Sequence, residues 1–455
     1  MSAIPADVDA ARGPPMAVPL RHFVVGLGLL VLGVALGLGV AAGVAPGAAA
    51  LAHVHLLLAG WVCVTIMGAM TQFVPVWSGT RLHSERLATV QLWLVAVGVV
   101  GVAAAFLAGR LGWVPLAGGA MALGFWTFAY NLGRTLGSLD ALDVTERHFA
   151  VALACFVLVS ALGLVLAVDF RVPLLAALPV GRSAVVGAHV ALAVFGAVLA
   201  TVVGALYQLA TMFTQTDLDR VDDGIRRVEE VAYPTGVGLL ALGRLLDAGP
   251  LARVGGVLVA CSLLAVGVVL ARRLLAARVD WTPMLRRYAV VALSLILWAA
   301  LALPAWLADA RSPDALFGAP GTSHLLALGV VGFVVLGTLY HVVPFIVWVH
   351  RYSDRLGYEP VPAIDDLYSA RVATADLGCL GAGTALLAGA DPFGLPPSTV
   401  AVGGALVLVG AVLASANLAW VVRVHSPYSL PGVLVGGGAT AGEEDATPSD
   451  ADARR

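Results

Sequence analysis

Three segments of the chain, spaced at nearly equal intervals, each contain two glycines eight residues apart. The first glycines of the pairs are separated by 136 and 133 residues. In two of the copies a histidine stands five residues before the first glycine, as His55 and His324. An internal repeat of this length predicts that one structural unit is used three times. The pairs are Gly60 with Gly68, Gly196 with Gly204, and Gly329 with Gly337.

The chain has the composition of a membrane protein. Hydrophobic residues make up 60% of its 455 residues, charged residues make up 12%, and the mean hydropathy is +0.93, which is outside the range of soluble domains. The net charge of −2 gives no basic surface for nucleic acid. The sequence predicts an all-α, polytopic membrane protein with twelve transmembrane helices. The twelve apolar segments lie near residues 22–45, 51–76, 87–108, 113–135, 148–168, 183–213, 229–246, 252–271, 287–308, 321–349, 366–389 and 397–424.

The arginines predict the orientation in the membrane. With the N-terminus inside, 20 arginines fall on the inner side and six on the outer side, which is a strong positive-inside bias. We therefore expect a multi-pass protein of the plasma membrane with both termini in the cytoplasm. Residues 1–20 are the expected cytoplasmic N-terminal tail, residues 21–425 the membrane domain, and residues 426–455 a disordered cytoplasmic tail.

The three glycine pairs fall on the second, sixth and tenth predicted helices. The repeat unit is therefore four helices, and we expect three such units in the chain. Because the three helices run in the same direction, His53, His55, His189 and His324 are predicted to lie near one level in the outer part of the membrane. His341 follows His324 by 17 residues, which places it about 25 Å deeper at the rise of an α-helix.

This arrangement resembles subunit I of the haem-copper oxidases and nitric oxide reductases. In that family, twelve helices form three four-helix arcs with histidines on helices 2, 6 and 10. The His-Val-His stretch at 53–55 is similar to that of the cbb3-type oxidases, although there it lies on helix 10. The tenth helix here has the family's spacing, which is carried by His324, Gly329, Gly337, His341 and Pro344.

The resemblance implies that His55 and His324 each give one axial imidazole to a low-spin haem between the second and tenth helices. The haem is expected to be of b type. Gly60 and Gly329 would give flat helix faces against which the porphyrin lies. Glycines also let helices pack closely in membranes, so both interpretations of Gly60 and Gly329 stay open here.

Two further histidines leave alternatives open. His53 could take the place of His55 as the haem ligand. His53 and His189 occupy matching repeat positions, each seven residues before a glycine, so they could together bind a second metal or haem. A polar contact near the membrane interface explains this pair equally well.

The chain departs from the family where the gas-reducing metal is bound. The family has a metal-ligand histidine in a His-Pro-Glu or similar motif on helix 6 and a His-His pair on helix 7. Here the sixth segment has only His189 and the seventh has no histidine. Thr322 stands where the family has the proximal ligand of a high-spin haem. Copper is therefore not expected, and the chain resembles a divergent member.

Three functions fit these observations. The first is a haem protein acting in electron transfer or in the chemistry of O2 or NO, surrounded by membrane lipid. It would work with a redox partner subunit or with a quinol or copper-protein donor; as an enzyme it would be an oxidoreductase. The second is a non-catalytic haem or metal carrier, sensor or assembly protein. The third is a transporter, which three four-helix repeats disfavour because transporters commonly have two six-helix halves.

Two polar positions inside the predicted spans have structural interpretations. Asp376 is the clearest acid within a span, and we expect it to pair with a polar group of a neighbouring helix. His341 stands where the other copies have Gln72 and Gln208. A hydrogen-bonding side chain therefore recurs at that position independently of any metal, which favours a structural role.

Overall fold

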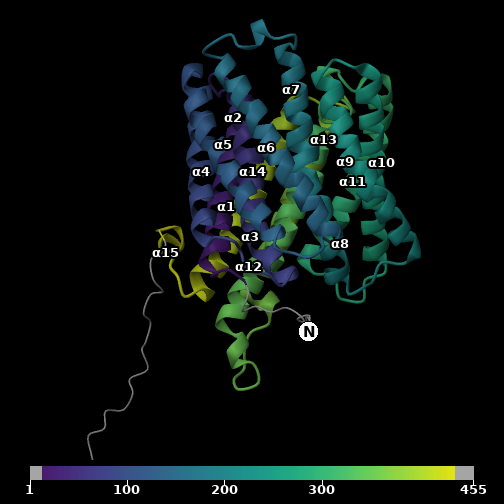
Figure 1. Cartoon of the computed structure of the whole chain (residues 1–455). Coiled ribbons are helices and arrows are strands. Elements are labelled where there is room, and N and C mark those ends of the chain that lie inside the picture. The colour runs from purple at the N-terminus through teal and green to yellow at the C-terminus, as the bar shows by residue number, and fades with distance from the viewer. Residues whose placement is uncertain (1–12, 436–455) are drawn as a thin grey trace, which may run out of the picture.

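The computed structural model describes residues 13–435, and the regular structure within that range is helical (Figure 1). Three of its long helices contain a π-helical stretch, labelled η2, η5 and η7. A short helix, α15 (Leu430–Val435), ends the described part. The long helices are α1 (Ala17–Ala41), α2–η2–α3 (Ala49–Trp77), α4 (Glu85–Leu107), α5 (Val114–Leu136), α6 (Val144–Asp169), α7–η5–α8 (Arg182–Thr214), α9 (Arg220–Leu245), α10 (Gly249–Leu275), α11 (Pro283–Asp309), η7–α12 (Leu325–Arg351), α13 (Ala370–Ala390) and α14 (Ser398–His425).

Eleven helices of the described chain are long and apolar enough to cross a membrane. The predicted class, an all-α multi-pass membrane protein, is confirmed. The apolar segment predicted at 229–246 falls in α9 (Arg220–Leu245), which is not one of these eleven helices. This helix starts nine residues before the apolar segment predicted at 229–246. The first half of α9 is rich in charge, and for this reason α9 is not among the eleven apolar helices. The charged residues are Arg220, Asp222, Asp223, Arg226, Arg227, Glu229 and Glu230.

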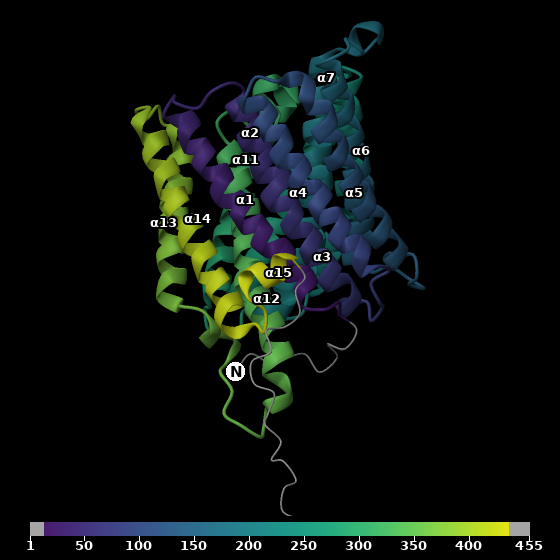
Figure 2. The same cartoon turned by 90° about the vertical axis from the view of Figure 1, so that its left-hand side faces the viewer.

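Successive long helices run in opposite directions through the bundle. In Figures 1 and 2 the lower end is the one at which α1 begins and α14 ends, and we use "lower end" and "upper end" in this sense. Helices α9, α10 and α11 pack in sequence on one side, and α13 packs against α14. Figure 2 shows α14 beside α1. The first and last long helices therefore lie together.

The π-helical stretches occur in the three helices that carry the glycine pairs. They are η2 (Leu56–Val62), η5 (Leu192–Val198) and η7 (Leu325–Gly332). Their first residues are separated by 136 and 133 residues, which are the intervals of the glycine repeat. All three stretches lie toward the upper end, because these helices run from the upper to the lower end. Because π-helical turns are rare and often lie at functional sites, this level of the bundle is a candidate functional site.

Five of the six long helices that start at the lower end, all except α1, are capped there by a side chain. Their N-cap residues are Ser84, Asp143, Asp219, Thr282 and Ser369, before α4, α6, α9, α11 and α13. Each accepts a hydrogen bond from a backbone N–H of the first turn, which satisfies a donor that the helix leaves free. Among the described residues, the long helices that start at the upper end show no such side-chain cap.

Both predicted tails fall partly outside the described residues. Of the N-terminal tail expected at 1–20, residues 1–12 lie outside, and α1 already begins at Ala17. Of the tail expected at 426–455, residues 436–455 lie outside, and α15 occupies residues 430–435. The guanidinium of Arg21 donates to the carbonyl oxygen of Val433 at 2.7 Å, which ties α15 to the lower end of α1.

Candidate functional site

His53 and His189 are held in the same way in two different parts of the bundle. His53 Nδ1 lies 2.8 Å from the carbonyl oxygen of Gly33 on α1, and His189 Nδ1 lies 3.0 Å from that of Val159 on α6. Each ring also packs against the glycine four residues further along that helix. Because a carbonyl oxygen only accepts hydrogen bonds, Nδ1 is the donor in both imidazoles. Both histidines therefore connect one helix to the preceding one.

His55 and His324 are bound differently. His55 Nδ1 lies 2.8 Å from the carbonyl oxygen of Leu51 in its own helix, and its ring lies 5.7 Å from that of Phe106 on α4. The bond to Leu51 fixes the proton on Nδ1 and leaves the Nε2 lone pair available to a metal. His324 directly precedes η7, is half-buried, and forms no hydrogen bond with a described residue. Neither imidazole connects two helices.

The four histidines lie near one another at the upper end. His53 is close to His324, and His55 is close to His189. The helices that carry the glycine repeat therefore bring these side chains into one region. Within residues 13–435 no group of three or more His, Cys, Asp or Glu side chains has an arrangement that could hold a metal ion.

Trp61 is on the second predicted helix, below the histidines, and faces the tenth. Its indole ring reaches Gly332 at the end of η7, where an added Cβ would lie 3.6 Å from the ring. Trp61 is 2% exposed, and its Nε1–H has no hydrogen-bond partner among the described residues. A buried donor without a partner costs free energy, so this N–H has an unused hydrogen bond.

The first glycine of each pair packs against the preceding long α-helix. An added Cβ at Gly60 would lie 3.3 Å from Leu29 on α1, one at Gly329 would contact Ser294 on α11, and one at Gly196 would contact Cys155 on α6. These contacts account for the glycines by close helix packing. The side of Gly60 and of Gly329 that faces the preceding helix is therefore occupied by protein.

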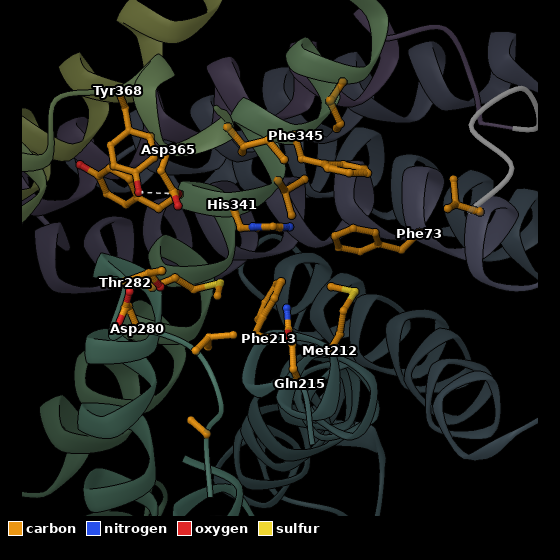
Figure 3. A pocket seen from close by; sticks show the side chains of 18 of the residues that line it. Phe73, Met212, Phe213, Gln215, Asp280, Thr282, His341, Phe345, Asp365 and Tyr368 are labelled. Atoms are coloured by element: carbon orange, nitrogen blue, oxygen red, sulfur yellow. Dashed lines mark hydrogen bonds between the residues drawn. The ribbon is translucent and has the colours of Figure 1, made fainter. Parts of the chain in front are cut away.

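A cavity of about 670 Å³ opens at the lower end, far along the same three helices (Figure 3). The last turns of α3 and α8 and the middle of α12 form its walls. The segments 277–284 and 364–368 complete it. Figure 3 shows the ring of His341 between Phe345 and Phe213, with Phe73 opposite. The cavity therefore joins parts of the chain that are far apart in sequence.

Polar groups with free hydrogen-bonding capacity face this cavity. His341 packs edge-on against Phe213 with ring centres 4.7 Å apart, and neither of its nitrogens bonds to a described residue. Gln72 also lines the cavity, is 7% exposed, and its Oε1 has no donor in the described chain. At the rim, burial and then the charge of Asp365 raise the pKa of Tyr368, so its phenol stays protonated and donates to Asp365 at 3.0 Å.

A buried ionic group connects α11, α12 and α13. The guanidinium of Arg287 and the carboxylate of Asp376 are both fully buried and form an ion pair. Tyr340 donates its hydroxyl hydrogen to the same carboxylate, and Asn417 on α14 donates to the Tyr340 oxygen at 3.1 Å. The expectation that Asp376 pairs with a neighbouring helix is confirmed. The sequence did not single out Arg287, because it stands at the edge of an apolar segment among loop arginines.

A second buried group connects α6, α8 and α9. His148 Nε2 lies 3.1 Å from one carboxylate oxygen of Glu229, and Tyr207 donates to the other at 3.0 Å. The histidine and glutamate side chains are 2% and 1% exposed. Sequence reasoning missed Glu229 because it stands at the start of the predicted seventh segment. The available signal was the tyrosine at matching repeat positions, Tyr207 and Tyr340.

Comparison with known proteins gives no family for this chain: no protein-family model matches it, and no curated protein matches it.

Proposed function

We propose that this chain is a haem-binding membrane protein, distantly similar to subunit I of the haem-copper oxidases. A low-spin haem of b type would be held between the second and tenth predicted helices by His55 and His324. The observation that carries the proposal is the difference between the four histidines at the upper end. His53 and His189 are accounted for by hydrogen bonds to other helices, whereas His55 and His324 are not.

The residues present fit such a group in their chemistry. His55 has its Nδ1 proton directed to Leu51, so its Nε2 is free to bind iron. The unpaired indole N–H of Trp61 offers a buried donor between the same two helices, and a carboxylate or other oxygen of a bound group would satisfy it. When bound, the haem would supply one-electron chemistry, used in electron transfer or in reactions of O2 or NO.

We also propose that the bundle consists of three four-helix units, beginning at α1, α6 and α11, with α9 as the twelfth span. Three observations support this. The π-helical stretches begin at the repeat intervals. The second glycines each pack against the first helix of their unit: Gly68 at His22, Gly204 at His148 and Gly337 at Arg287. Asn131 and Asn417 both bond the N–H and the carbonyl of the serine that caps the unit's third helix.

The remaining parts of the proposal concern the surroundings of the protein. The arginine distribution supports a plasma-membrane protein whose lower end faces the cytoplasm, together with both termini. A redox partner subunit, or a quinol or copper-protein donor, would deliver electrons, and no copper is expected. A haem carrier, sensor or assembly protein without turnover would use the same two ligands.

The test is a reduced-minus-oxidised optical spectrum of the full-length protein, purified in detergent from cells supplied with a haem precursor. We expect a sharp low-spin band at about one haem per chain. His55→Ala and His324→Ala should each abolish that band. The matched controls are His53→Ala and His189→Ala, which lie at the same level and should retain it.

A folded but colourless wild-type protein would overturn the proposal, as would a band that survives in both His55→Ala and His324→Ala. If His53→Ala removes the band and His55→Ala does not, His53 is the ligand. Consumption of O2 or NO with an artificial donor, measured with the metal content, separates catalysis from carriage. One copper per chain with sustained turnover would contradict the expectation of no copper.

A further inference from the structure

Two polar side chains without hydrogen-bond partners among the described residues line the cavity at the lower end. The buried Oε1 of Gln72 has no donor among the described residues, and His341 has no hydrogen bond on either nitrogen. The last turns of α3 and α8 and the first turn of α11 line the same cavity, so two negative helix ends and one positive helix end face it. The Gln72 oxygen and the unprotonated ring nitrogen of His341 are therefore available to a ligand that donates hydrogen bonds.

The walls of the cavity are aromatic. Phe73 and Trp77 stack with ring centres 4.5 Å apart and an angle of 2° between their planes. Phe345 stacks on His341 at 5.8 Å, and Phe213 meets the same imidazole edge-on. Aromatic faces attract cations through their quadrupole, and they pack well against flat apolar rings.

The rim adds negative charge. Asp280 and Asp365 line the cavity together with one arginine, Arg278, and all three residues are exposed. Two carboxylates against one guanidinium leave an excess of one negative charge at the entrance. This excess stands out because the lower end is the arginine-rich end of the sequence. The rim thus favours a cation, as do the aromatic walls.

We propose that this cavity binds an amphipathic aromatic cation whose ring carries hydrogen-bond donors. The ring would lie among Phe73, Phe213 and Phe345. Its donors would face Gln72 and His341, and its charge would lie toward the acidic rim. A volume of about 670 Å³ is in the range of cavities that enclose small organic ligands. The site is separate from the upper-end histidines, so it does not depend on the haem proposal.

The probe is ethidium, a flat aromatic cation with two amino groups, titrated into nuclease-treated full-length protein in lipid nanodiscs and followed by fluorescence. Two analogues separate its features. The 5-ethyl-6-phenylphenanthridinium ion lacks the amino groups, and neutral 6-phenylphenanthridine also lacks the charge. We expect ethidium to bind most tightly and the neutral compound least tightly.

Variants connect that order of affinity to the cavity. Asp280→Asn combined with Asp365→Asn should weaken ethidium about three- to tenfold, as expected for two exposed charges, and should leave the neutral compound unchanged. Gln72→Leu should weaken ethidium and leave the analogue without amino groups unchanged. The matched controls are Asp140→Asn, an exposed acid at the same end, and Gln208→Leu, the corresponding repeat position outside the cavity lining.

The proposal is overturned if ethidium binds the aspartate double variant and Gln72→Leu as tightly as wild type. It is also overturned if the control variants weaken ethidium as much as the cavity variants, because binding would then be general partition into the nanodisc. Phe345→Ala gives an independent reading, since removing a wall should weaken all three compounds. Each variant is compared only after its unfolding temperature has been shown to match wild type.

Discussion

The two buried ionic groups lie in corresponding places in the second and third proposed units but use different chemistry. In the third unit Arg287 faces Asp376, and in the second unit His148 faces Glu229. Both carboxylates also receive a tyrosine hydroxyl at the matching repeat position. An arginine is always charged, whereas a histidine can be neutral. Loss of the acid would therefore leave an unpaired buried charge in the third unit, whereas in the second unit the histidine can become neutral.

Among the described residues, the first proposed unit has no ion pair in the corresponding place. His22 occupies the position of His148 against the second glycine, and its Nε2 is buried without a partner among the described residues. Gln91 on α4 follows the capping serine by seven residues, as Asp376 does on α13. The buried acid thus faces an arginine in the third unit and a histidine in the second, and the first unit has the neutral amide of Gln91 instead. The helices of the described chain therefore pack at this place without an ion pair in the first unit.

The largest expected effect comes from Asp376→Ala. The variant leaves the fully buried Arg287 guanidinium without its counter-ion, and breaking a buried pair in this way costs about 3–5 kcal/mol. The measurement is the free energy of unfolding of the full-length protein in mixed micelles. The double variant Arg287→Leu with Asp376→Leu is the control and should recover most of the loss. A loss that persists in the double variant would mean that packing, not charge, dominates.

The corresponding change in the second unit, Glu229→Ala, should cost less. His148 can remain neutral when the acid is removed, so the cost is that of two unpaired polar groups, about 2–3 kcal/mol. The same unfolding measurement ranks the two acids directly. Equal losses for Glu229→Ala and Asp376→Ala would contradict the idea that permanent charge distinguishes the two units.

The sequence predicts the fold better than it predicts these groups. Eleven helices can be recognised from composition and length alone, because a span must be apolar and must be as long as the bilayer is thick. Asp376 stood out because an acid inside an apolar segment needs a partner. Arg287 and Glu229 did not, since each lies at the edge of a segment, where charge is ordinary. The partner of a buried group depends on helix packing, which one sequence does not specify.

The cavity and the π-helical stretches show the same limit. His341 and Gln72 could be matched by repeat position, but their shared cavity depends on the segments 277–284 and 364–368, whose course is not encoded in any periodic pattern. The π-helical stretches begin beside His55 and His324, yet the residues in them are the same apolar types found in the α-helical parts. Local composition gives no signal for a change in helical winding.

A smaller effect should distinguish the two asparagine contacts. Asn131→Ala removes the bonds to the N–H and carbonyl of Ser84, at 2.9 Å each, and should cost about 1–2 kcal/mol. Asn417→Ala removes the equivalent bonds to Ser369 and also the bond to the Tyr340 oxygen. It should cost more than Asn131→Ala, because it weakens the ionic group as well. If Asn417→Ala costs less, the ionic group is independent of α14.

The smallest effect, and the one of opposite sign, is expected for Gln91→Leu. Gln91 is fully buried, and neither polar atom of its side chain amide has a hydrogen-bond partner among the described residues. A buried amide without partners is unfavourable, so an apolar side chain of similar length should be neutral or stabilising by about 1 kcal/mol. Gln91→Glu is the informative counterpart, because it introduces an acid at the position of Asp376 in the unit where His22 takes the place of His148. Stabilisation by Gln91→Glu, lost again on adding His22→Ala, would show that the first unit can form the same kind of pair. Destabilisation by Gln91→Leu would instead show that the amide is satisfied, and that the first unit is held by hydrogen bonds rather than by charge.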